Sequence, residues 1–242
     1  MKKQTTYTIR LTLWSLAILL TGSFLFTGCG EDDPVVEPKD YGSSKVTFYH
    51  VNTGLVNEVA FFRSDSIPVS STHPMYEGTV NATVPNGENL SYSVKGLDGT
   101  VLASTTGSHD SSQFATVIFS GNANQKDLFI AKSEKIEVAE GNVAIRFVHA
   151  ASDAGPRSLK IGSAAGAPVA SGISYMGASD KYVLVGSDTK ALVIVDETTS
   201  KPPITLTVDL SSGKVWTVVF HGTEAPVDEA YKWTGSLISD QQ

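Results

Sequence analysis

Two histidines at the ends of similar segments are the first side chains in this sequence that could perform chemistry. His50 and His149 lie 99 positions apart, in the stretches V-T-F-Y-H-V-N-T-G (46–54) and V-A-I-R-F-V-H-A-A-S-D-A-G-P (143–156). Side chains alternate between the faces of a strand, so each histidine shares the core-facing side with Phe48 or Phe147. A histidine in that position typically hydrogen-bonds a nearby carbonyl or hydroxyl group and stabilises the following turn. We therefore expect His50 and His149 to be structural, with ligand contact and metal binding as the alternatives.

The other polar side chains form no catalytic or metal-binding pattern. His73, His109 and His221 lack the His-x-x-x-His spacing of metal ligands. The stretch G-I-S-Y-M-G (172–177) is one residue too long for the nucleophile motif G-x-S-x-G, and G-S-A-A-G (162–166) lacks the lysine of a phosphate-binding loop. Paired acids stand in tether or turn sequence, where solvated carboxylates are typical and calcium binding is the alternative: Glu31-Asp32-Asp33, Asp196-Glu197 and Asp228-Glu229. The sequence therefore predicts no catalytic residues, no metal site and no cofactor.

Two aromatic side chains near the carboxyl end offer a candidate ligand-binding site. Tyr231 and Trp233 alternate in the stretch Tyr231-Lys232-Trp233, directly after an acidic loop. Such a pair could form a stacking platform for a sugar or a peptide. The alternative is that both aromatics belong to a last strand that packs back on the core.

The amino-terminal segment predicts export and membrane attachment. Basic residues precede an apolar stretch at 11–26, which is shorter than the roughly 20 residues of a spanning helix. The stretch ends in Leu25-Phe26-Thr27-Gly28-Cys29, which resembles the lipobox of bacterial lipoproteins. The resemblance implies that residues 1–28 are a signal peptide and that Cys29 becomes the lipidated, palmitate-bearing first residue. An ordinary cleaved signal peptide with an incidental cysteine is the alternative.

The segment after Cys29 predicts an unfolded spacer. Prolines and acids in G-E-D-D-P-V-V-E-P-K-D (30–40) disfavour regular structure, so residues 29–44 form a disordered acidic tether. Acids directly after the cysteine resemble the export signal of surface lipoproteins in one group of Gram-negative bacteria. We therefore expect a protein anchored to the outer membrane through acylated Cys29, on the cell surface or on the periplasmic face.

Composition and charge narrow the possible partners. The formal charge is −7 for the whole chain, and it becomes −10 without residues 1–28, which carry three basic residues and no acids. Such a surface argues against nucleic acid, since that partner requires lysine and arginine. Cys29 is the only cysteine, so no disulfide stabilises the fold and each domain depends on its apolar core.

From residue 45 onward the pattern predicts an all-β fold. Short apolar runs recur every 8–12 residues between turn-forming residues, which is typical of a sandwich or a small barrel. Leu97-Asp98-Gly99 is the clearest hairpin turn, because Asp-Gly accepts positive φ angles. The strands are expected near 45–52, 57–63, 78–84, 90–96, 100–105, 113–120, 127–131, 142–150, 157–161, 167–170, 180–186, 190–195, 203–209 and 214–221.

The two halves of this region have similar sequences. Tyr76-Glu77-Gly78 matches Tyr175-Met176-Gly177 at the same offset of 99, and the stretch F-A-T-V-I-F-S-G (114–121) matches V-W-T-V-V-F-H-G (215–222) at 101. A period near 100 residues corresponds to a whole domain. We therefore expect two tandem β-sandwich domains of the immunoglobulin or transthyretin type, at 45–134 and 135–242.

The second domain resembles a known family. The stretch A-I-R-F-V-H-A-A-S-D-A (144–154), the later Tyr175-x-Gly177 and the strand W-T-V-V-F-H-G (216–222) are similar to domain of unknown function family 4397. That resemblance implies an exported, often lipid-anchored bacterial β-sandwich, and the first half is similar to a diverged copy. The family has no established catalytic residues, so the resemblance implies a fold and a location but no mechanism.

These observations together predict a function without catalysis. We expect binding, adhesion or a structural role at the cell surface, with a surface glycan or protein as a partner besides the lipid bilayer. The alternative is an accessory hydrolase or glycan-processing enzyme that uses loop carboxylates.

Overall fold

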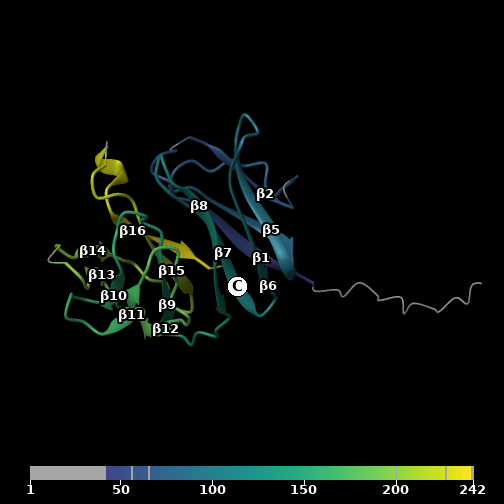
Figure 1. Cartoon of the computed structure of the whole chain (residues 1–242). Helices are drawn as coiled ribbons and strands as arrows, with labels where there is room; N and C mark the ends of the chain where they lie inside the picture. The colour runs from purple at the N-terminus through teal and green to yellow at the C-terminus, as the bar shows by residue number, and fades with distance from the viewer. Residues whose placement is uncertain (1–41, 56, 65, 200, 227, 241–242) are drawn as a thin grey trace, which may run out of the picture. The chain divides into compact units, whose positions relative to one another are not determined.

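The structure is a computed structural model that describes residues 42–55, 57–64, 66–199, 201–226 and 228–240 (Figure 1). Within these residues the regular elements are β-strands and one short 3-10 helix, Glu229–Tyr231. The predicted signal peptide, Cys29 and most of the predicted tether lie outside the described part of the chain. Among the residues described, no helix is long and apolar enough to cross a membrane.

The first half of the described chain is a sandwich of two four-stranded sheets. One sheet has the order β4-β1-β7-β8 and the other the order β3-β2-β5-β6. Its strands are β1 (Ser43–His50), β2 (Val59–Arg63), β3 (Ile67–Pro68), β4 (Thr79–Pro85), β5 (Gly87–Gly96), β6 (Val101–His109), β7 (Gln113–Gly121) and β8 (Lys126–Glu134). The two sheets enclose one apolar core, in which Phe48 and Val117 of one sheet pack with Phe61 and Tyr92 of the other.

The second half repeats this arrangement. Its sheets have the orders β12-β9-β15-β16 and β11-β10-β13-β14. The strands are β9 (Asn142–His149), β10 (Arg157–Ile161), β11 (Pro168–Ile173), β12 (Val183–Gly186), β13 (Ala191–Asp196), β14 (Ile204–Thr207), β15 (Val215–His221) and β16 (Thr234–Ser239). A second apolar core forms around Phe147, Leu159 and Phe220.

The strand registers confirm the repeat that the sequence predicts. Strands β1 and β7 pair in parallel with Phe48 opposite Val117, and β9 and β15 pair in parallel with Phe147 opposite Val218. These residues are equivalent at the offsets of 99 and 101. The chain is therefore all-β with two sandwich-like halves, as the sequence predicts.

The predicted strands agree with the structure to within a few residues, and the differences have local causes. The hairpin at Leu97-Asp98-Gly99 joins β5 to β6, with Gly99 at φ +82°. Strand β15 is central in its sheet and buried on both faces, as its apolar pattern indicates. No strand was expected at Ile67–Pro68, because two residues are too few for an alternating pattern.

A further apolar cluster is shared by the two halves. Tyr49 and Ile118 of the first half pack with Val148 and Val219 of the second. These side chains project from the faces of β1, β7, β9 and β15 opposite to the two sandwich cores, because strand side chains alternate. The prediction of two independently folding domains is untested, but the halves share a buried contact.

Two tyrosines that match in the repeat reach across this contact. Tyr76 of the first half places its hydroxyl 3.2 Å from Nδ1 of His221, and Tyr175 of the second half donates a hydrogen bond of 2.7 Å to Asp127 and lies 3.0 Å from the hydroxyl of Ser120. Ser120 and His221 occupy the same position at the ends of β7 and β15. Each half therefore contributes the same tyrosine to the other.

Candidate functional site

The two predicted histidines are buried at the ends of β1 and β9. His149 Nε2 lies 2.9 Å from the carbonyl oxygen of Gly155, and its Nδ1 accepts a hydrogen bond of 3.3 Å from the backbone of Ala151. His50 Nδ1 accepts the equivalent bond from Asn52, also at 3.3 Å. Burial lowers the pKa of each histidine to about 4, so both are neutral at pH 7. These contacts connect each histidine to the turn that follows its strand.

Across 42–240, apart from the four positions not described there, no three histidine, cysteine, aspartate or glutamate side chains are grouped as metal ligands.

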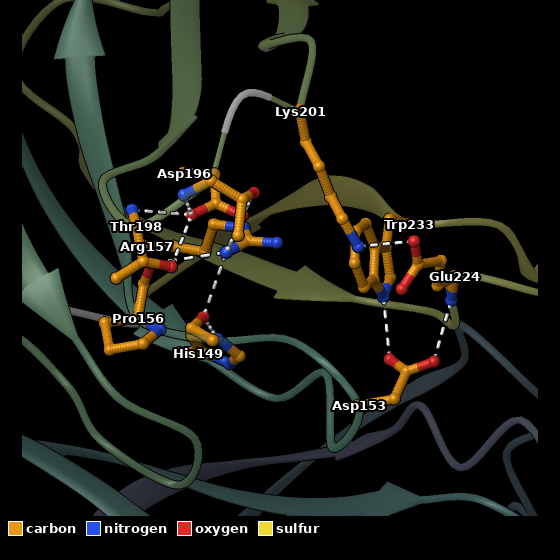
Figure 2. A network of polar contacts seen from close by, with 11 residues as sticks. His149, Asp153, Pro156, Arg157, Asp196, Thr198, Lys201, Glu224 and Trp233 are labelled. Carbon is orange, nitrogen blue, oxygen red and sulfur yellow. Dashed lines mark hydrogen bonds and ion pairs between the residues drawn. The ribbon is translucent and has the colours of Figure 1, made fainter.

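Trp233, predicted as part of a stacking platform, is held by a network at one end of the second half (Figure 2). Its Nε1 donates a hydrogen bond of 2.8 Å to Asp153, in the loop between β9 and β10. The ammonium of Lys201 lies 4.4 Å from the ring centroid and the guanidinium of Arg157 lies 4.9 Å from it. Lys201 also pairs with Glu224. The indole therefore bridges the β9–β10 loop and the β13–β14 loop.

The second part of this network is a buried ion pair. Arg157 Nη1 lies 2.8 Å from a carboxylate oxygen of Asp196, and both side chains are almost fully inaccessible to solvent. Burial alone raises the pKa of Asp196, but hydrogen bonds from Thr199 and Thr198 outweigh burial and hold the pKa well below its usual range. Asp196 is therefore ionised, and it belongs to one of the paired acids that the sequence places in a solvated turn. The carboxylate is paired and buried instead.

Tyr231 does not lie beside Trp233 in a common platform. It stands in the 3-10 helix, and its ring packs edge-on against Tyr76 at a centroid distance of 4.9 Å. A last strand does form, but β16 begins at Thr234, after both aromatics. Tyr231 therefore packs at the contact between the halves, and Trp233 packs against the core of the second half.

The first half carries a cleft that the sequence did not predict. It has a volume of about 600 Å³ and lies among the β1–β2 loop, the residues before β4 and the β5–β6 turn. Its apolar lining includes Leu97 and Met75, whose exposed fractions are 62% and 56%. The lining residues are Leu55, Asn57, Glu58, Met75, Gly96, Leu97, Asp98, Thr100 and Leu102. A leucine in a hairpin turn, where polar residues are usual, was the one signal in the sequence.

The acidic side chains of this cleft are exposed. Asp98 accepts hydrogen bonds from the backbone and hydroxyl of Thr100 at 3.0 and 2.9 Å. The bond from the backbone of Thr100 is the largest of the effects that lower the pKa of Asp98. Glu58, in the β1–β2 loop, is a second exposed acid of the lining. The lining of the cleft therefore combines apolar side chains with two carboxylates.

A polar groove of about 460 Å³ runs between the edge strands β4 and β16. It is lined by Tyr49, Glu77, Asn81 and Ser236, among others. Burial raises the pKa of Glu77, which is also one of the few non-glycine residues with a positive φ, at 61°. Glu77 is the one acid among the described residues that line this groove.

The comparisons with known proteins leave the function to this geometry. No protein-family model matches the sequence, and no curated protein matches it. Among solved structures, a "putative cell adhesion protein" from Bacteroides eggerthii aligns over 83% of this chain and 96% of its own length. The sequence identity is 12% and the TM-score is 0.20.

Proposed function

We propose that this chain is an exported, lipid-anchored binding protein, and that the cleft of its first half holds the ligand without catalysis. The observation that carries the proposal is the exposure of Leu97 and Met75 around a concave surface. Apolar side chains exposed together on a hollowed surface mark contact sites, whereas single exposed ones are ordinary. Met75 adds an adaptable, unbranched side chain of the kind that contact surfaces favour.

The acids of the cleft support binding over hydrolysis. A general acid needs a raised pKa so that it stays protonated at neutral pH. The pKa of Asp98 is lowered instead, since its carboxylate accepts two hydrogen bonds from Thr100. Asp98 therefore serves as a fixed negative charge. The accessory hydrolase that uses loop carboxylates remains the alternative, and Glu77 is the residue to test for it.

Binding at the cleft is tested with a neutral apolar dye. The mature chain, residues 29–242 with Cys29→Ser to keep it unlipidated, is titrated with Nile red. We expect fluorescence enhancement that the double variant Leu97→Ser and Met75→Ser abolishes. The matched control is Leu184→Ser, because Leu184 is also exposed, at 51%, but lies on β12. Equal enhancement in the double variant and in the control would contradict the proposal.

Membrane attachment through Cys29 is supported by the sequence alone. The apolar stretch stops at Phe26, and the sole cysteine follows two small residues. Two or more acyl chains hold a protein at a bilayer stably, at about 0.8 kcal/mol per buried CH₂ group. We expect Cys29→Ser to release the protein into the soluble fraction or to leave the precursor uncleaved. Mass spectrometry of the mature amino terminus is the direct measurement, and an unmodified terminus on the membrane-bound protein would overturn the anchor.

A further inference from the structure

Strand β4 forms one edge of the sheet β4-β1-β7-β8. Hydrogen-bonded and non-hydrogen-bonded pairs of residues alternate along an antiparallel ladder. The register of β1 and β4 continues to His50, which donates a hydrogen bond of 3.1 Å to the carbonyl oxygen of Gly78. The even-numbered residues of β4 therefore bond to β1, and the backbone N–H and C=O groups of Thr79, Asn81 and Thr83 point away from the sheet.

These outward backbone groups are accessible. Among the described residues β4 pairs with β1 alone, and no other backbone hydrogen bond between them includes Thr79, Asn81 or Thr83. The side chains of these three residues lie on the same face of the sheet as Tyr49, which is buried against the second half. All three are nevertheless exposed. The second half therefore covers β1 on this face and leaves the edge at β4 open.

The corresponding edge of the second half is protected. Strand β12 takes the place of β4 in its sheet, but it has four residues where β4 has seven. Before β12 the pairing with β9 is reduced to an isolated bridge at Ala178, and the exposed Asp180 and Lys181 follow it. Short edge strands, interruptions and charges prevent pairing with other chains.

Strand β4 lacks these protective features. Its sequence T-V-N-A-T-V-P (79–85) contains no charged residue, and its register with β1 is continuous. Its one proline is the last residue, where it interrupts no pairing within the strand. A long, regular and uncharged edge of this kind is a template for an additional strand.

We propose that β4 pairs in antiparallel orientation with β4 of a second copy of this chain, about a two-fold axis at Ala82. Ala82 is the middle residue of β4, so this axis brings all residues of the two strands opposite one another. Asn81 of each copy exchanges both backbone hydrogen bonds with Thr83 of the other copy, and Val80 lies opposite Val84. The sheet of the first half then continues from one copy into the other.

The composition of the edge favours a second copy as the partner. Two-fold pairing sets valine opposite valine and asparagine opposite threonine, and such β-branched and polar cross-strand pairs are stabilising. The chain has a net charge of −7, but the paired strands themselves bring no like charges together. One pair of strands buries little surface, so we expect a dimer that forms and dissociates with concentration. The inference goes beyond the proposed function, because it uses β4 and not the cleft.

Sedimentation velocity of the mature chain, residues 29–242 with Cys29→Ser, measures this association. We expect Thr83→Pro to weaken the dimer by at least about tenfold, because proline removes an outward donor from each copy and leaves the bonds to β1 intact. Thr83→Lys should also weaken it, since it places like charges beside the two-fold axis. Thr205→Lys is the matched control, because Thr205 is an exposed threonine of the edge strand β14, and it should leave the dimer unchanged. A chain that stays monomeric up to about 1 mM, or a dimer that both Thr83 variants preserve, would overturn the inference.

Cysteine cross-linking tests the position of the axis. Residues directly opposite each other in a non-hydrogen-bonded pair have Cα atoms about 4.5 Å apart, which is within the range of a disulfide. Because Cys29→Ser removes the only cysteine, Ala82→Cys in that background introduces a single thiol at the axis. We expect mild oxidation to link two copies of Ala82→Cys covalently and to leave Thr205→Cys monomeric. Failure of Ala82→Cys to cross-link, or equal cross-linking of Thr205→Cys, would overturn the pairing about Ala82.

Discussion

Arg146 carries a full positive charge where no solvent reaches it. Its guanidinium donates hydrogen bonds of 2.6 Å to Thr217, 3.0 Å to Ser133 and 3.0 Å to Thr116, and it lies 3.5 Å from Asp240. Ser133 and Thr116 belong to the first half and the other two residues to the second. One side chain therefore ties the two halves together through polar bonds, beside the apolar cluster that they share.

Removing this guanidinium should be costly. Arg146→Met leaves the Asp240 carboxylate buried without its cation, so we expect a loss of about 3–5 kcal/mol in the free energy of unfolding. The double variant with Asp240→Asn should recover part of that loss, because the uncompensated charge is gone. Urea denaturation measures both variants. A double variant no more stable than Arg146→Met would contradict this account of the buried charge.

The buried histidines make stability depend on pH. Burial lowers the pKa values of His50 and His149 to about 4 and that of His221 to about 3, whereas an unfolded histidine titrates near 6.5. Between these pKa values the unfolded chain binds more protons than the folded chain. The free energy of unfolding therefore keeps the full contribution of these histidines above about pH 6.5 and decreases as the pH falls towards 4.

We expect each of these histidines to contribute up to about 1.4 kcal/mol per pH unit to that loss. His149→Gln should therefore flatten the dependence of the unfolding free energy on pH between 5 and 6.5, measured by urea denaturation. At pH 7, His149→Ala should cost about 1–3 kcal/mol, since the buried backbone nitrogen of Ala151 loses its acceptor and the Gly155 carbonyl keeps only Arg157 as a donor. A slope identical to that of the wild-type chain would contradict the titration of His149.

At the scale of strands, most of the fold could be predicted from alternation and turn residues. Val46–His50 and Val143–His149 show apolar runs that end in small polar residues, and both are strands. Strand β16 was harder to predict from the sequence, because T-G-S-L-I-S (234–239) contains only two large apolar residues. The cleft could not be predicted, since Leu55, Met75 and Leu97 come from three connections that only the strand pairing brings together.

Substitutions at two glycines, Gly99 and Gly222, allow the cost of backbone strain to be compared with the cost of a steric clash. Gly99 has φ +82° with no atom within 4 Å of an added Cβ, whereas at Gly222, with φ +98°, that Cβ would lie 2.4 Å from the carbonyl oxygen of Lys232. Gly99→Ala should cost about 1–2 kcal/mol, the price of a left-handed alanine. Gly222→Ala should cost more, because the clash is with backbone. Thermal unfolding compares the two, and equal losses would show that the Lys232 backbone moves aside freely.

At the scale of the whole molecule, each half has its own apolar core and contributes side chains to a third cluster, which the two halves share. The cores around Phe48 and Phe147 support the prediction that residues 45–134 and 135–242 fold alone. The shared cluster means that a separated half would expose Ile118 or Val219. We therefore expect each half to fold on its own and also to associate with the other half.

Expressed separately, the halves should each show a cooperative thermal transition and should form a one-to-one complex when mixed. Ile118→Asp should prevent the complex, because it places a charge in the shared cluster, while Leu184→Asp on exposed β12 should not. Sedimentation velocity measures the association. The absence of a transition in both halves would refute the two-domain interpretation, and a complex that tolerates Ile118→Asp would refute the role of the cluster.

The position of β1 determines how the protein responds to tension. The amino-terminal side of the chain enters the fold at Ser43, and β1 is hydrogen-bonded to β4 on one flank and to β7 on the other. A load applied along that strand shears both rows of hydrogen bonds at once, instead of opening them in succession. The loop that follows β1 borders the cleft. A ligand that pulls against the proposed membrane anchor would therefore load a strand that is hydrogen-bonded on both flanks.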